Sequence, residues 1–150
     1  MFTPTATRVS RFDPPETREA IRRKTEQSIA YYVAHPEEID ARLVELDVEW
    51  DIERGLETGS SCLTLMGLAL AIFKNRKWLL LSVAVQGFFL EHSLQGWCPP
   101  LPVLRRLGYR TQSEIDKERY ALKAIRGDFR SVLDTEMDGQ CKSASQAVNM

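Results

Sequence analysis

The chain has few cysteines, and they lie far apart. Cys62, Cys98 and Cys141 are an odd number at wide spacings, which favours neither a disulfide framework nor a C-x-x-C metal site. Free thiols are typical of a reducing compartment. The sequence therefore predicts no metal ion and no cofactor.

An excess of one charge is also missing, because 20 Lys and Arg residues balance 21 Asp and Glu residues. A protein that holds nucleic acid by counterion release needs a basic surface, so we expect no nucleic-acid partner. The first 20 residues lack the apolar core of a secretory signal. Any membrane targeting is therefore expected from the interior of the chain.

Charge is scarcest in the middle of the chain. Between Thr58 and Leu104 the charged residues are Lys74, Arg76, Lys77 and Glu91. The run 58–73 has 16 uncharged residues. As a helix it spans about 24 Å, which is short of the roughly 30 Å hydrocarbon layer of a bilayer. Taken alone, this run predicts a marginal span.

A second apolar run starts after a short polar loop. Trp78 and Trp97 lie nineteen residues apart in it. This spacing is about 28 Å along a helix, which suits tryptophans at the two interfaces of one bilayer. The sequence therefore predicts an all-α fold built on a two-span transmembrane helical hairpin over residues 58–108.

The first span has small, weakly polar residues at helical spacing, namely Ser60, Thr64, Gly67 and Ala71. In lipid, helices associate through close backbone approach and side-chain hydrogen bonds. We expect these four residues, the helix-packing seam, to face the second span. Large apolar residues are then left to face lipid.

The second span contains several polar residues, among them Gln86, Glu91, His92 and Gln95. A charged carboxylate deep in a bilayer costs about 2.5–3.5 kcal/mol, so we expect Glu91 to be paired, protonated or close to the headgroups. A proton or cation site is the alternative interpretation. The same residues leave open a soluble helical domain in which the hairpin is the buried core.

The N-terminal side predicts a polar leader and then helices. Residues 1–12 have no periodicity and predict a disordered leader. Residues 13–57 predict an amphipathic helical extension, opened by an N-cap carboxylate at Asp13 and restarted at Pro36. The apolar stripe of its second helix consists of Ile39, Leu43, Leu46 and Trp50.

The C-terminal side predicts one more helix, over residues 109–126. Thr111 and Glu114 have the spacing of a capping box, in which each side chain binds a backbone N–H of the other residue. Residues 127–150 are polar with few apolar anchors and predict a disordered tail.

A proline-rich turn follows the second span and ends it, because proline has no N–H to donate. This segment, coming directly after an apolar hairpin, resembles the end of the YgaP-like inner-membrane transmembrane domain. The paired helices of that bacterial family finish in Gly-x-Cys-Pro and then Leu-Gly. The matching residues are Gly96, Cys98, Pro99, Leu107 and Gly108.

The resemblance covers about residues 50–110 and implies a two-span inner-membrane protein that often associates with itself. Some members are fused to a rhodanese sulfurtransferase domain. The chain departs from the family in Pro100, Pro102, its charged N-terminal extension and the Glu91–His92 pair. The resemblance therefore gives little support to a sulfur-related role for this chain.

Cys98 is the candidate reactive thiol. Arg105 and Arg106 follow it and favour a lowered thiol pKa, and a thiol at the water boundary can accept persulfide sulfur from a partner enzyme. Against this, no histidine is adjacent in sequence, and the prolines cannot donate the amides of an anion-binding loop. A structural cysteine at a tight turn is the alternative.

The motifs found concern packing, capping and membrane boundaries, and none is an active-site constellation. We therefore expect a non-enzymatic integral inner-membrane protein without catalytic residues. Its hairpin is expected to form homo-oligomers in the lipid bilayer and to present cytoplasmic helices to a protein partner. The alternatives are a membrane-anchored persulfide carrier that uses Cys98 and a soluble helical interaction module.

Orientation follows from the basic residues near the spans. Six Lys or Arg residues flank the hairpin and three lie in its loop. Because basic residues are retained on the cytoplasmic side, this distribution favours cytoplasmic termini.

Overall fold

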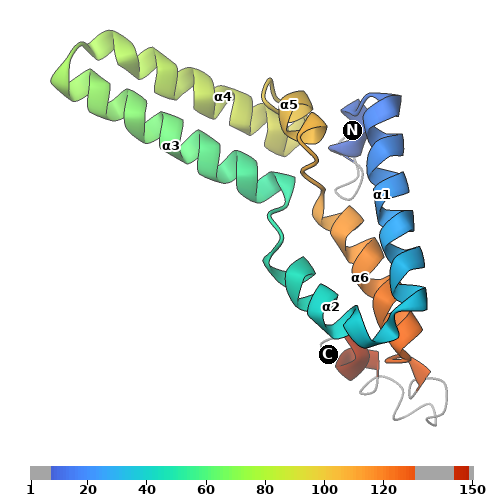
Figure 1. Ribbon diagram of the computed structural model, residues 1–150. Helices are drawn as coiled ribbons and strands as arrows, with labels where there is room; N and C mark the ends of the chain where they lie inside the picture. The colour runs from blue at the N-terminus through green and yellow to red at the C-terminus, as the bar shows by residue number, and fades with distance from the viewer. Residues whose placement is uncertain (1–7, 131–143, 149–150) are drawn as a thin grey trace. The chain divides into compact units, whose positions relative to one another are not determined.

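The computed structural model describes residues 8–130 and 144–148, and this part of the chain is helical, so the all-α prediction is confirmed. Short 3-10 helices and a helical stretch at 144–148 accompany six α-helices. These are α1 (Pro15–Ala34), α2 (Ile39–Val48), α3 (Ile52–Phe73), α4 (Leu79–Gln95), α5 (Leu101–Arg106) and α6 (Gln112–Arg126) (Figure 1). Within the described ranges, the β-type pairing is one isolated bridge between Asp51 and Arg110.

The chain divides into two compact units. The first, called here the hairpin unit, comprises Met1–Arg22 and Trp50–Glu114. The second, called the three-helix unit, comprises Arg23–Glu49 and Ile115–Met150. Helices α1 and α6 each contribute residues to both units.

In the hairpin unit, α3 and α4 run side by side in opposite directions and are joined by a tight loop (Figure 1). Asn75 in this loop accepts a hydrogen bond from the Lys77 N–H at 2.9 Å. The buried apolar cluster of the unit lies at the other end of the two helices. It consists of Val9, Ile52, Leu56, Cys98 and Leu101.

Helix α3 begins six residues before the predicted span. Its N-cap is Asp51, whose carboxylate accepts a hydrogen bond from the Arg54 N–H at 2.9 Å. The preceding Glu49 is extended, with ψ at 130°. This extended residue and the new cap separate α2 from α3, so Trp50 leaves the apolar stripe to which the sequence assigned it.

Length and hydropathy single out α3 as a candidate membrane span. It has 22 residues and a mean hydropathy of 1.5 over its most apolar window, of which 11% is buried. Among the described residues it is the one helix that is both long and apolar enough to cross a membrane. Helix α4 has 17 residues, so the predicted second span is shorter than this measure requires.

Helix α4 ends at Gly96, which has a φ of 85°. A Cβ atom at this position would lie 2.5 Å from the backbone oxygen of Arg8. Both the left-handed backbone and this close approach require glycine here. The residue therefore closes the helix and makes room for the N-terminal segment.

The three-helix unit has its own apolar core, formed by Ile39, Leu43, Leu46, Ile115 and Leu122. Beside it, the carboxylate of Glu118 is fully buried. It accepts hydrogen bonds from Ser28 Oγ at 2.6 Å and Arg42 Nε at 2.9 Å. Burial alone lowers the pKa of Arg42, but its bonds to Glu118 and Glu45 raise the pKa above the ordinary value.

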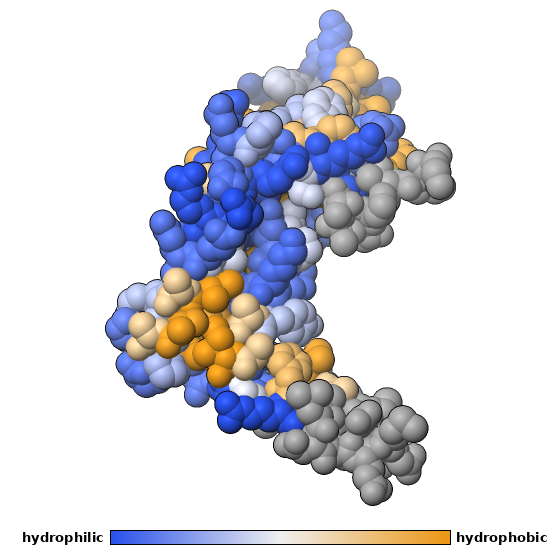
Figure 2. Space-filling view, turned by 90° about the vertical axis from the view of Figure 1, so that its right-hand side faces the viewer, coloured by the Kyte–Doolittle hydropathy of each residue, from blue (hydrophilic) through white to orange (hydrophobic). Residues whose placement is uncertain are grey.

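Figure 2 turns the side of α1 toward the viewer, and hydrophilic residues cover most of this face. The largest group of hydrophobic residues on this face lies below its middle, and smaller groups lie near its top. The sequence of α1 explains the polar surface, because Ile21 is its buried residue and charged residues alternate around the helix. The predicted first helix therefore exists, with a narrow apolar stripe.

The ends of the chain differ from the predicted disordered segments where they are described. Ser10–Phe12 form a 3-10 helix within the predicted leader, and 144–148 are helical within the predicted tail. Residues 1–7 of the leader, and 131–143 and 149–150 of the tail, lie outside the described residues.

The close contact between α3 and α4 depends on Gly67. A Cβ atom there would lie 2.4 Å from Ser82 Oγ, whereas a Cβ at Gly87 would meet nothing within 4 Å. We predict that Gly67→Ala lowers the free energy of unfolding by about 1–3 kcal/mol through overpacking. Gly87→Ala, the matched control, leaves it unchanged or raises it by about 0.5–1 kcal/mol. Reversible unfolding in detergent micelles measures both, and equal effects would contradict the assignment.

The buried Glu118 depends on Arg42 as its charged partner. We predict that Arg42→Ala lowers the free energy of unfolding by about 3–5 kcal/mol, because it leaves a buried carboxylate without its counter-ion. Glu45 also bonds Arg42 but its side chain is 65% exposed, so Glu45→Ala is expected to cost below about 1 kcal/mol. Chemical denaturation of the full chain compares the two variants.

Candidate functional site

A histidine and a carboxylate meet at the base of the hairpin. His92, on the last turns of α4, is 1% exposed, and its Nε2 lies 2.9 Å from Glu53 Oε2 on the first turn of α3. The other carboxylate oxygen of Glu53 accepts a hydrogen bond from Arg8 at 3.0 Å. The carboxylate thus joins the imidazole to the N-terminal segment.

Cys98 is the third member of this cluster. It is 3% exposed and interacts through its thiol with the ring of His92. The second ring nitrogen, Nδ1, is buried and has no hydrogen-bond partner among the described residues. The base of the hairpin therefore brings an imidazole and a carboxylate into contact close to a buried thiol.

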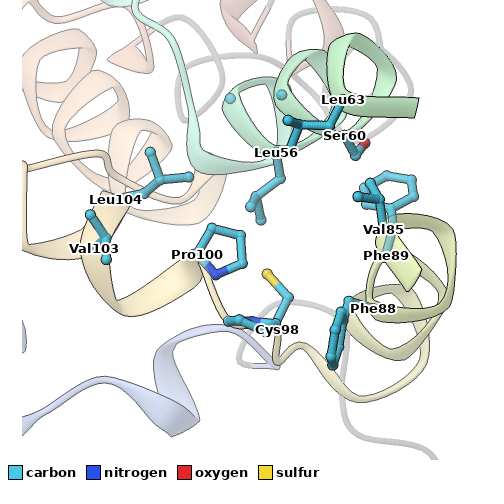
Figure 3. A pocket seen from close by; sticks show the side chains of 13 residues that line it. Leu56, Ser60, Leu63, Val85, Phe88, Phe89, Cys98, Pro100, Val103 and Leu104 are labelled. Carbon is cyan, nitrogen blue, oxygen red and sulfur yellow. The ribbon is translucent and has the colours of Figure 1, made fainter. Parts of the chain in front are cut away.

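Cys98 also lines an apolar pocket of about 440 Å³. In Figure 3 its sulfur points into the space between Leu56 and Pro100. Phe89 of α4 and Leu104 of α5 contribute further apolar walls. The pocket therefore brings three helices of the hairpin unit around one thiol.

A buried arginine holds the elements next to this pocket. The guanidinium of Arg105 on α5 donates to the carboxylate of Asp13 at 3.0 Å and to that of Glu114 at 2.7 and 2.8 Å. It also donates to the backbone oxygen of Tyr109 at 2.8 Å. The side chain of Arg105 is 0% exposed. Its donors are thus distributed over two carboxylates and one backbone carbonyl.

Arg105 with its partners Asp13 and Glu114 is called here the Arg105 clasp. Its ion pairs stabilise the charged forms of Arg105 and Glu114. Burial opposes charge on Arg105, but its bonds to Glu114 and Asp13 raise its pKa above the ordinary value. Burial likewise favours the neutral form of Glu114, yet its bonds to Arg105 and Thr111 lower the pKa of this carboxyl below its usual range. Arg105 and Glu114 are therefore both charged at neutral pH.

The clasp changes two sequence-based interpretations. Asp13, expected to cap α1, bonds Arg105 instead, and α1 begins at Pro15. Arg105, expected to lower the pKa of Cys98, is occupied by two carboxylates. His92 is the residue that interacts with the thiol in its place.

The seam residues fall at different depths between α3 and α4. Thr64 accepts from Ser82 Oγ at its backbone oxygen, at 3.0 Å, and from Gln86 Nε2 at its Oγ1, at 2.8 Å. Gly67 is buried against Ser82. Ser60 and Ala71 are half-buried, and Ser60 bonds the backbone of its own helix.

The turn residues that carried the family resemblance close helices. Gly96 ends α4 and Gly108 follows α5, both with positive φ. Pro99 precedes α5, the short helix Leu101–Arg106 that the sequence interpretation treated as a turn. Leu107 is exposed.

The remaining predicted residues lie apart from the cluster. Glu91 is half-buried, one residue before His92. Cys62 is exposed on α3, and Cys141 lies outside the described residues. In the described part of the chain, no group of three potential ligands is arranged to hold a metal ion.

Sequence reasoning missed the pairing of His92 with Glu53. The two are 39 residues apart, with Glu53 in the first turn of α3 and His92 in the last turn of α4. Folding two antiparallel helices about the loop at 74–78 brings these positions level with each other. The antiparallel geometry of the predicted hairpin could therefore have predicted this pair.

Comparison with protein-family models, with curated proteins and with solved structures finds no match to this chain.

The lowered pKa of Glu114 predicts a pH-dependent stability. Because this pKa is depressed in the folded chain, the stabilisation is present above its ordinary value of 4.5 and is lost as the pH falls through the folded value. We expect the denaturation midpoint to fall on acidification below about pH 4.5 and this slope to flatten in Glu114→Gln. Denaturant titrations between neutral and acid pH measure it. An identical slope in both proteins would contradict a charged clasp.

Proposed function

We propose that the chain is an integral protein of a bacterial inner membrane, anchored by α3 and α4 as a two-span hairpin with both termini in the cytoplasm. The hairpin self-associates and presents the helices outside the bilayer to a protein partner. It belongs, in this proposal, with the YgaP-like transmembrane domains. The role is that of a non-catalytic membrane component.

The observation that carries this proposal is the distribution of polar and apolar side chains over α3 and α4. Large apolar residues of both helices are exposed, including Ile72 at 79%, Leu80 at 72% and Val83 at 68%. The hydroxyl of Ser82 and the amide of Gln86 instead bond Thr64 across the hairpin. Apolar surface outside and hydrogen bonds between helices suit a lipid environment.

The same distribution argues against a soluble module with the hairpin as its core. The buried apolar clusters of the chain consist of residues from outside the middle of the hairpin. Soluble monomers rarely expose continuous apolar patches of more than a few hundred square ångströms. The exposed surface of α3 and α4 therefore supports contact with lipid.

Self-association is supported by small residues on one exposed face of α4. Ala84 and Gly87 are exposed and lie three residues apart on α4, hence on one face of the helix. A Cβ atom at Gly87 would meet nothing within 4 Å. Small residues at a lipid-exposed face allow a second helix to approach closely.

A second candidate function is a membrane-anchored thiol that carries a transferable group on Cys98. The interaction of the Cys98 thiol with His92 supports it, because a neighbouring imidazole activates a thiol. The persulfide carrier predicted from the sequence is one form of this candidate. Persulfide labelling that survives Cys98→Ser would remove it.

The membrane proposal predicts opposite outcomes for charge at two exposed positions. We expect Val83→Arg to cost about 2.5–3.5 kcal/mol of insertion free energy and to reduce the carbonate-resistant fraction, because the side chain enters hydrocarbon. Leu107, which is 71% exposed outside the hairpin, gives the matched control Leu107→Arg, expected to leave insertion unchanged. Membrane fractionation after carbonate extraction measures both.

Reporter fusions at the two termini complete the test. A two-span hairpin places both reporters in the cytoplasm, whereas a single span through α3 separates them. Recovery of the intact protein in the soluble fraction, with Val83→Arg as well folded as the parent, would establish a soluble helical module and overturn the proposal.

A further inference from the structure

Helix α2 exposes an apolar stripe on the side turned away from its own core. Ala41, Val44 and Val48, called here the α2 stripe, lie three and four residues apart and hence on one face of the helix. Val44 is 65% exposed and Val48 is 67% exposed. The buried residues of α2 lie on the opposite face, namely Ile39, Leu43 and Leu46. Helix α2 therefore has two apolar faces, of which the core covers one.

Valine is a costly residue at an exposed helical position. Its branched side chain loses rotamer freedom in a helix, so it stabilises the helix less than Ala, Glu or Lys does. Burial within the three-helix unit does not offset this loss at Val44 and Val48, since both side chains are mostly exposed. A partner that covers the α2 stripe would supply the missing burial.

Carboxylates border the α2 stripe on both sides. By helical position, Asp40 and Asp47 lie on one side of it and Glu45 lies on the other. Each carboxylate pairs with an arginine of the unit and is more exposed than that arginine; the pairs are Asp40–Arg126, Asp47–Arg119 and Glu45–Arg42. The arginines thus fix the carboxylates, whose exposed oxygens stay open to a second cation.

Negative charge is concentrated in this part of the chain. Residues 37–49 have six acidic residues and one basic residue, although the whole chain has a net charge of -1. When Arg119 and Arg126 are added, because they pair with this segment from α6, acidic residues still exceed basic ones by six to three. The surface around the α2 stripe is therefore acidic.

This charge selects among the possible occupants of the stripe. Anionic lipid headgroups repel it, and a second copy docked through the same face would bring like charges together. Residues 131–143, which lie outside the described residues, have three acidic residues and one lysine and do not complement it. A basic occupant does complement it, and a helix with apolar residues three and four positions apart has the shape to cover the stripe.

We propose that the α2 stripe binds a basic amphipathic helix of a partner protein. The apolar residues of that helix pack on Val44 and Val48, and its Lys or Arg side chains pair with the carboxylates on either side. This inference rests on the part of the proposed function that gives the chain a protein partner, and it names the chemistry of that partner. It does not depend on the membrane anchor.

The test uses the full-length protein in non-ionic detergent micelles and two labelled helical peptides as probes. One peptide has a leucine stripe bordered by lysines, and the other has the same leucine stripe bordered by glutamates. Fluorescence anisotropy measures the Kd of each peptide, with empty micelles as the blank. We expect the lysine peptide to bind about 10-fold more tightly or better, and its affinity to fall as salt screens the charges.

Two pairs of variants separate the stripe from general attraction. Val44→Lys places a cation in the stripe and is expected to weaken binding of the lysine peptide by about 10-fold or more. Its matched control is Val33→Lys, at a valine of α1 that is 58% exposed in the same unit, and this variant leaves the Kd within about 2-fold. Asp47→Asn weakens binding by about 2- to 5-fold, whereas Glu16→Gln, at an exposed residue of α1, does not.

Each outcome decides the inference. Tighter binding of the lysine peptide that is lost in Val44→Lys and kept in Val33→Lys supports it. Equal affinity for the two peptides, binding of neither, or equal effects of the two valine variants would overturn it. A dimer in sedimentation that Val44→Lys dissociates would show a second copy on the stripe, which also overturns it. Carbonate extraction tests the membrane anchor separately, so a soluble protein that binds the lysine peptide contradicts the proposed function and keeps the inference.

Discussion

The hairpin unit depends on one fully buried guanidinium. Arg105 joins three segments, because it binds Asp13 before α1, lies itself on α5 and binds Glu114 at the start of α6. A buried charge of this kind is tolerated only when its donors are satisfied, and removing one partner leaves an uncompensated charge. The clasp therefore fixes the position of α5, and α5 with its preceding turn forms one side of the Cys98 pocket.

Two different constraints act along α3. Its first turns contribute Ile52 and Leu56 to the buried cluster, and Glu53 to the histidine pair. Farther along, Thr64 and Gly67 meet α4 while Ile72 and Phe73 are exposed. Packing against protein explains the first part, and contact with an apolar solvent is the physical reason we propose for the second. The first turns of α3 thus pack against protein, whereas the rest of the helix exposes apolar side chains.

The sequence predicted those features of the fold that depend on hydrogen bonds between residues close together in the chain. The capping box is confirmed, since the Thr111 N–H donates to Glu114 at 2.8 Å and the Glu114 N–H to Thr111 Oγ1 at 3.3 Å. Gly127 ends α6 with a φ of 94°. The break before α3 was missed because Trp50 continues the apolar period of α2. Asp13 and Arg105 are 92 residues apart, so only the folded chain reveals that this ion pair displaces the expected N-cap.

The position of the polar cluster follows from the cost of charge in an apolar medium. Glu53 pairs with both His92 and Arg8 at the base of the hairpin, the end where the buried apolar cluster that contains Ile52 also lies. The charged groups that pair between segments therefore lie at the end where the N-terminal segment, α3 and α4 meet, whereas the middle of the hairpin has uncharged hydrogen bonds between Thr64, Ser82 and Gln86. Cys98 lies at that end, where its buried side chain lines the apolar pocket.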